Sequence, residues 1–265
     1  MTKEFKNKTL TIAGSDSGAG AGIQADLKTF SSLGVYGSTV ITAVTAQNTV
    51  GVHSFEMLSE SIVESQINSV MSDIGASSIK TGMLGSSSII NIVCKSLRNF
   101  NFDNLVVDPV MVAESGDVLL EESAVKAYIN NLIPISTLIT PNILESEKIS
   151  GINIDSEEKI ILAGKKMLEM GAKKVLIKGG HLNGEFSEDF LFGSDKILRF
   201  KERRINTKNT HGTGCTLSAA ITAYLSKGAS MESAIRMSKE YITKSLKYSY
   251  DIGSGSGPVN HFYNK

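Results

Sequence analysis

Strand-like and helix-like segments alternate along almost the whole of this 265-residue chain. Short β-rich runs predict strands at residues 9–13, 36–45, 78–80, 105–107, 137–140, 174–177, 186–192 and 196–200. Apolar residues at helical spacing predict helices at residues 21–33, 63–74, 88–97, 121–132, 155–170, 213–226 and 231–248. Repeated alternation of this kind is typical of a mostly parallel sheet with helices on both faces, a three-layer α/β/α fold. With no internal repeat and no low-complexity linker, we expect residues 1–265 to form one domain.

The composition favours a globular protein and argues against a polyelectrolyte or membrane partner. Hydrophobic residues make up 41% of the chain and charged residues 20%, which is enough apolar material for a large core. Lys plus Arg and Asp plus Glu balance at 27 each, so we expect neither nucleic-acid binding nor attraction to an anionic membrane. No apolar run approaches the ~20 residues of a membrane span, and no signal peptide is recognisable. Two cysteines make no disulfide framework, which favours the reducing cytoplasm.

Polar side chains follow several of the predicted strands directly. Asp108 comes after the strand at 105–107, Asn142 and Glu145 after 137–140, and Lys178 after 174–177. In a doubly wound sheet, ligands bind outside the carboxyl ends of the strands. Each residue alone could be an ordinary loop residue, but an acid, an amide with an acid, and a base at three strand ends together indicate a polar site on one rim.

A glycine-rich turn precedes the predicted helix at 213–226. Gly212, Thr213, Gly214 and Cys215 lead into it, so several backbone N–H groups have no partner within the helix. Together with the helix dipole, such groups form a binding site for an anion, typically phosphate. The alternative is a turn that only reverses the chain.

The first glycine turn, residues 14–22, also lies between a strand and a helix. Residues 20–25 fit a loose dinucleotide-binding fingerprint, but no acid follows between Asp26 and Glu56 to hold a ribose hydroxyl. A Walker A motif is also absent from the sequence. Asp26 falls inside the apolar face of the following helix. It is either a partly solvated carboxylate near a helix N-terminus or an acid aimed at a pocket.

As a set, these segments resemble the ribokinase-like kinases, and most closely the bacterial hydroxymethylpyrimidine/phosphomethylpyrimidine kinases of thiamine synthesis. The resemblance covers nearly the whole chain. It rests on residues 11–30, 42–49, 80–84, 108–113, 140–145, 178–182, 206–220 and 257–263.

The resemblance implies a substrate, two cofactors and a set of roles. It implies ATP and Mg²⁺ as cofactors, phosphorylation of an aminopyrimidine alcohol and then of its monophosphate, and a homodimer. Asn142 and Glu145 would organise Mg²⁺ and phosphate, Asp108 would be a second metal-linked acid, and Lys178 would contact the nucleotide phosphates. Thr213 would lie between the two glycines of the anion hole, Gly212 and Gly214. The residues implied to line the pyrimidine pocket are Gly14, Asp26, Gln47, Met83 and Val110.

Cys215 is where the chain departs from ribokinase proper, which carries an aspartate base at this position. The pyrimidine kinases share the cysteine. A thiol at a helix N-terminus is expected to have a lowered pKa. Cys215 could therefore accept the proton of the substrate hydroxyl, or it could only orient the substrate or fill space.

Three other functions compete with the pyrimidine kinase. A pyridoxal kinase of the same fold is the nearest, but some of these use a second cysteine in the lid, and the lid expected at 112–117 has none. A cysteine hydrolase could use Cys215 with His211, although that would leave Asp108, Glu145 and Lys178 without a role. A pyrimidine sensor without catalysis would be expected to lack the phosphate-binding residues, which here look complete.

Overall fold

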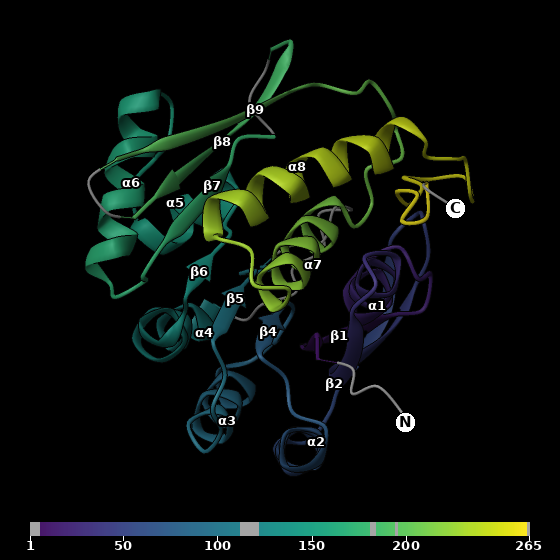
Figure 1. Ribbon diagram of the computed structural model, residues 1–265, viewed down its shortest axis with the longest axis vertical. Coiled ribbons are helices and arrows are strands. Elements are labelled where there is room, and N and C mark those ends of the chain that lie inside the picture. The colour runs from purple at the N-terminus through teal and green to yellow at the C-terminus, as the bar shows by residue number, and fades with distance from the viewer. Residues whose placement is uncertain (1–5, 112–121, 181–183, 194–195, 264–265) are drawn as a thin grey trace.

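A nine-stranded, mostly parallel sheet forms the middle layer of the protein, seen in a computed structural model that describes residues 6–111, 122–180, 184–193 and 196–263 (Figure 1). The strand order is β3-β2-β1-β4-β5-β6-β7-β8-β9. The strands are β1 Lys8–Asp16, β2 Tyr36–Gln47, β3 Val52–Met57, β4 Ser78–Thr81, β5 Asn104–Val107, β6 Leu138–Ile139, β7 Val175–Lys178, β8 Phe186–Phe192 and β9 Leu198–Arg203. The six central strands pair in parallel: β2, β1, β4, β5, β6 and β7. Strand β3 at one edge, and β8 and β9 at the other, are added by antiparallel pairing.

Helices cover both faces of the sheet, which confirms the predicted three-layer fold (Figure 1). On one side lie α1 Gly22–Ser32, α7 Thr213–Ser226 and α8 Met231–Lys247. On the other lie α2 Glu60–Asp73, α3 Ser87–Leu97, α4 Glu122–Ala127, α5 Ile143–Ser150 and α6 Glu157–Glu169. A π-helical turn, Tyr128–Leu132, and a 3₁₀ turn, Ile133–Ile135, continue α4.

Alternate residues of the central strands supply two separate apolar layers. Leu105 and Val107 of β5 join the cluster beneath α2, α3 and α6, whereas Val106 joins the cluster beneath α7 and α8. Successive side chains of a strand point to opposite faces, so a strand covered on both faces must be apolar throughout. All three residues are buried, and the site is therefore carried by strands that are fixed from both sides.

Two elements escaped the sequence analysis. Strand β3 has no fully buried residue and α5 is only eight residues long, so neither has the apolar signal on which the prediction relied. The basic run at 201–203 belongs to the end of β9, an edge strand. No helix within the described ranges combines the length and the apolar character needed to cross a membrane.

Candidate active site

A buried ion pair lies at the carboxyl rim of the sheet. Asp108 follows β5, Lys178 ends β7, and the Lys178 Nζ lies 2.9 Å from Asp108 Oδ1. The Asp108 carboxylate also accepts hydrogen bonds from Thr140 at 3.1 Å and Ser218 at 3.0 Å. Burial alone would raise the pKa of Asp108, but Lys178 and then Lys80 outweigh that effect and lower it. The predicted meeting of these strand ends is therefore confirmed.

The N-terminus of α7 faces this ion pair. A Cβ added to Gly214 would lie 3.3 Å from the Lys178 Nζ and 4.0 Å from Asp108 Oδ2. Gly212 has a left-handed backbone, with φ of 79°, and a Cβ there would lie 1.8 Å from the carbonyl oxygen of Gly20. Only glycine permits that conformation and that approach. The second glycine turn thus opens a helix, as predicted, and brings its first turn next to a lysine.

Asn142 and Glu145 form a capping box at the start of α5. The Glu145 carboxylate accepts from the Asn142 N–H at 2.7 Å, and the Asn142 side chain accepts from the Glu145 N–H at 2.9 Å. An isolated bridge pairs Asn142 with Lys178, so this corner joins the same rim. Burial raises the pKa of Glu145 to about 7. The neighbouring Lys178 opposes this shift, and the negative charge of Asp108 adds to it.

The two carboxylates suit a hard divalent cation shared with phosphate oxygens. No group of three or more acidic, cysteine or histidine side chains gathers as a complete metal cage in the described ranges. Mg²⁺ is usually held by only one or two carboxylates together with water and substrate phosphates. The raised pKa of Glu145 reports a buried anion that lacks enough positive charge, which a cation would supply. Asp108 and Glu145 therefore fit Mg²⁺.

The lowered pKa expected for the Cys215 thiol is wrong. Burial raises the pKa of this thiol to about 11, and Asp26 and Asp108 act in the same direction. Lys80 and a backbone hydrogen bond from Gly22 oppose the shift but do not overcome it. A helix N-terminus stabilises a thiolate, but the low dielectric and two nearby carboxylates destabilise the thiolate by more. These effects favour the neutral thiol form of Cys215.

Two residues predicted to line the pyrimidine pocket are brought together. A Cβ added to Gly14 would lie 3.1 Å from the Met83 sulfur, so the bare backbone at Gly14 leaves room for this side chain. Val110 follows Asp108, whose carbonyl accepts from the Val110 N–H at 2.8 Å. Gln47 is half-buried at the end of β2.

Asp26 is fully buried and paired with Lys80, which the sequence analysis missed. Its Oδ2 lies 2.8 Å from the Lys80 Nζ and accepts from the Thr11 hydroxyl at 2.6 Å, while its Oδ1 has no partner among the described residues. Both charged side chains are 0% exposed, which rules out the partly solvated carboxylate. An acid on an apolar helix face needs a countercharge, and the lysine in the short predicted strand at 78–80 was the available signal.

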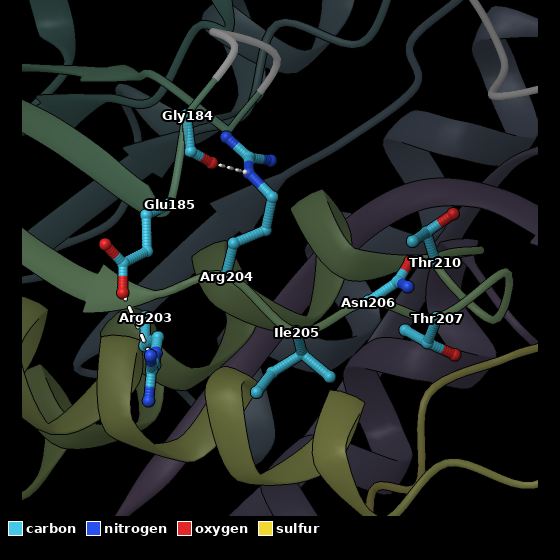
Figure 2. A pocket seen from close by; sticks show the side chains of 8 residues that line it. All are labelled: Gly184, Glu185, Arg203, Arg204, Ile205, Asn206, Thr207 and Thr210. Carbon is cyan, nitrogen blue, oxygen red and sulfur yellow. Dashed lines mark hydrogen bonds and ion pairs between the residues drawn. The ribbon is translucent and has the colours of Figure 1, made fainter.

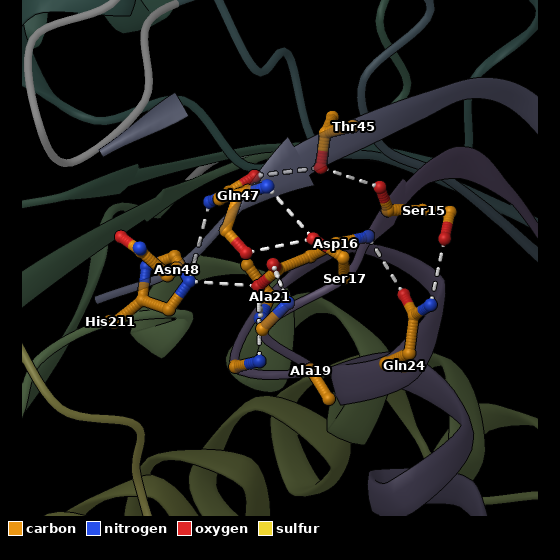
Figure 3. Close-up of polar contacts among 12 residues, drawn as sticks. Ser15, Asp16, Ser17, Ala19, Ala21, Gln24, Thr45, Gln47, Asn48 and His211 are labelled. Atoms are coloured by element: carbon orange, nitrogen blue, oxygen red, sulfur yellow. Dashed lines mark hydrogen bonds and ion pairs between the residues drawn. The ribbon is translucent and has the colours of Figure 1, made fainter. Parts of the chain in front are cut away.

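Asp16 and His211 join the two glycine turns, and this contact was also missed (Figure 3). Asp16 accepts from the backbone of Gly18, Gly20 and Ala21 at 2.8–3.0 Å, which folds the first turn around its carboxylate. His211 Nε2 lies 2.9 Å from the same carboxylate. The imidazole thus faces Asp16, which removes the support for a cysteine hydrolase built on His211.

A pocket opens beside the segment that connects β9 to α7 (Figure 2). Its volume is about 430 Å³. It is lined by Gly184, Glu185, Arg203, Arg204, Ile205, Asn206, Thr207 and Thr210. Thr210 connects it to the tip of α7, because the Thr213 hydroxyl donates to the Thr210 carbonyl. The expected lid at 112–117 and the histidine and leucine at 181–182 lie outside the described residues.

Comparison with known proteins identifies the class and then the family. Over 97% of both chains, the structure superposes on a Bacillus subtilis pyridoxal kinase in complex with ADP, with a TM-score of 0.90 and 38% identity. The fold is therefore that of a ribokinase-like kinase, and the chain is a phosphotransferase. The family model for phosphomethylpyrimidine kinase matches residues 16–260, and the chain belongs to that family.

Two curated relatives show how the chain relates to whole proteins. It is 47% identical to a hydroxymethylpyrimidine/phosphomethylpyrimidine kinase of Rhizobium meliloti, with 96% of each chain covered. It is 46% identical to the thiamine biosynthesis bifunctional protein ThiED of Geobacter sulfurreducens over 97% of its own length. The match spans only 52% of that bifunctional protein, about half its length.

Proposed function

We propose that this protein uses ATP to phosphorylate 4-amino-5-hydroxymethyl-2-methylpyrimidine, and then its monophosphate, in thiamine biosynthesis. The observation that carries the proposal is the Asp108–Lys178 pair directly beside Gly214 at the tip of α7. A lysine and a helix N-terminus that face one point form a cradle for the transferring phosphoryl group. The family and the names of its relatives supply the acceptor.

The proposed mechanism is in-line transfer of the γ-phosphoryl group to the substrate hydroxyl. Its transition state spreads negative charge over the phosphoryl oxygens, so positioning and electrostatics provide most of the catalysis. Lys178 and the N–H groups of residues 212–215 would stabilise those oxygens. Asp108, Asn142 and Glu145 would hold Mg²⁺, which neutralises phosphate charge when bound. The neutral Cys215 thiol would orient the hydroxyl and is not the base in this mechanism.

The ligands would occupy two adjoining regions. The nucleotide base and ribose would lie in the pocket that ends at Thr210, and the phosphates would then lie at Thr213. The pyrimidine would lie against Gly14 and Met83, where the missing Cβ leaves space. The ring would also contact Gln47, Val110 and Asp26. The free Oδ1 of Asp26 gives that acid one unused acceptor.

The test is turnover of the purified protein with ATP and Mg²⁺. ADP release would be followed by a coupled assay, and the two phosphorylated pyrimidines by phosphorus NMR. Both products are expected from the pyrimidine alcohol. Pyridoxal is the necessary comparison, since a pyridoxal kinase shares the fold at a TM-score of 0.90. A higher kcat/KM for pyridoxal would contradict the pyrimidine assignment, and binding without ADP release would indicate a sensor.

The proposal includes a homodimer in the cytoplasm. Strand β2, edge strand β3 and the turn between them expose Val44, Val50 and Phe55, at 49%, 61% and 47%. A second copy of the chain would cover these side chains. Light scattering after gel filtration should give twice the mass of the 28.4 kDa chain, and Phe55→Glu should lower this mass.

The cytoplasmic location agrees with the two cysteines. Both are free thiols, as a reducing compartment keeps them.

A further inference from the structure

The side-chain amide of Gln47 lies between a hydroxyl and an imidazole (Figure 3). Its Oε1 lies 3.2 Å from the Thr45 hydroxyl oxygen, and its Nε2 lies 3.4 Å from His211 Nε2. The two ends of an amide have nearly the same shape but opposite hydrogen-bonding character. The hydrogens on the neighbouring groups therefore decide which end belongs on which side.

Asp16 determines where the His211 hydrogen is. Its Oδ2 accepts from the N–H groups of Gly20 and Ala21 and lies 2.9 Å from His211 Nε2. An ionised carboxylate only accepts hydrogen bonds, so His211 Nε2 must carry a hydrogen and donate it. The same nitrogen then has no lone pair for the Gln47 amino group. As placed, two donors face each other at 3.4 Å.

Thr45 leads to the same conclusion from the other side. Its hydroxyl has one hydrogen, which it donates to the carbonyl oxygen of Ser15 at 2.9 Å, a group that only accepts. The Thr45 oxygen then faces Gln47 Oε1 with lone pairs, and two acceptors meet at 3.2 Å. Turning the amide by half a rotation about its last bond exchanges the oxygen and the nitrogen. The contact with Thr45 then becomes a hydrogen bond, and the Gln47 oxygen shares the single His211 Nε2 hydrogen with Asp16, while no other atom has to move.

We propose that His211 is a positioning residue that fixes the Gln47 amide with its oxygen toward the imidazole and its amino group toward Thr45. The amide then keeps one N–H and one lone pair, in a fixed order, for a ligand. An edge that carries a ring nitrogen beside an amino group matches such a pair. A pyridine alcohol without the amino group satisfies only one half. This consequence for the ligand rests on the proposed function, whereas the orientation itself does not.

The first test reads the hydrogen directly, without any substrate. Nitrogen NMR of the full chain with ¹⁵N-labelled histidine resolves the ring nitrogens of its four histidines. The His211 signals are those lost in His211→Gln. A protonated Nε2 in the wild-type protein at neutral pH is expected. An unprotonated Nε2 would overturn the proposal whether or not the protein proves to be a pyrimidine kinase.

The second test compares two replacements of His211 by kinetics. His211→Gln keeps an N–H near the Nε2 position, whereas His211→Leu removes it. We expect His211→Leu to raise KM for the pyrimidine alcohol about tenfold, as loss of one orienting hydrogen bond predicts. KM for ATP should change less than about twofold, and His211→Gln should recover most of the loss. Equal losses in both variants, or no loss in either, would overturn the proposal. If His211→Leu does not fold, the NMR result decides alone.

Discussion

Removing Lys80 should destabilise the protein strongly, because the substitution leaves the Asp26 carboxylate buried without its countercharge. The two side chains are 0% exposed and their charged atoms are 2.8 Å apart. At an effective dielectric constant of about 20, the attraction at that distance is about 6 kcal/mol. Desolvation of both groups offsets much of it, but breaking one side of a buried pair typically costs about 3–5 kcal/mol. Lys80→Met should therefore lower the free energy of unfolding by about 3–5 kcal/mol.

The chain offers a matched control in an exposed ion pair. Lys95 lies 3.4 Å from Glu64, and its side chain is 71% exposed. Such pairs contribute about 0–1 kcal/mol. Urea denaturation followed by far-UV circular dichroism would measure both variants. With a denaturant slope of about 3 kcal/mol/M, Lys80→Met should lower the midpoint by about 1 M or more, and Lys95→Met by at most about 0.3 M.

A double variant separates the lost contact from the stranded charge. Asp26→Asn combined with Lys80→Met removes both charges, so it should be more stable than Lys80→Met alone. If Lys80→Met shifts the midpoint no more than Lys95→Met does, the argument that a buried, uncompensated carboxylate dominates is refuted.

Three further predictions concern the rim of the sheet. Lys178→Met should lower kcat about 10²–10³-fold by removing a charge from the phosphoryl cradle, while Lys173→Met, exposed just before β7, should have no effect; equal kcat values would contradict the cradle. Metal-free protein should lose stability as pH rises from about 4.5 to 7, because the fold keeps the Glu145 proton that the unfolded chain releases; Glu145→Gln should reduce this slope in thermal melts, and an unchanged slope would count against it. Cys215→Ala should keep kcat within about tenfold of the wild type, since a neutral thiol is no base at pH 7; a loss near 10³-fold would restore the base assignment.

The site could be predicted from the sequence where it depends on single strand ends. Asp108 and Lys178 each follow a short apolar run, and parallel strands must end on the same edge, so their meeting required no knowledge of side-chain packing. Gly212 and Gly214 could be placed at the start of a helix for a similar local reason. The thiol of Cys215 could not be judged in that way. Its pKa depends on burial and on carboxylates contributed by other segments of the chain.

Local pattern by itself determined the layered α/β/α fold, the polar rim and the family, because these follow from side-chain periodicity and short motifs. Only the tertiary structure decided which charges neutralise each other. Asp26 and Lys80 are 54 positions apart, and Asp16 and His211 are 195 apart. Coulombic and desolvation energies depend on distance and burial in space, which sequence spacing does not specify. The protonation states on which the chemistry depends are therefore a property of the folded chain.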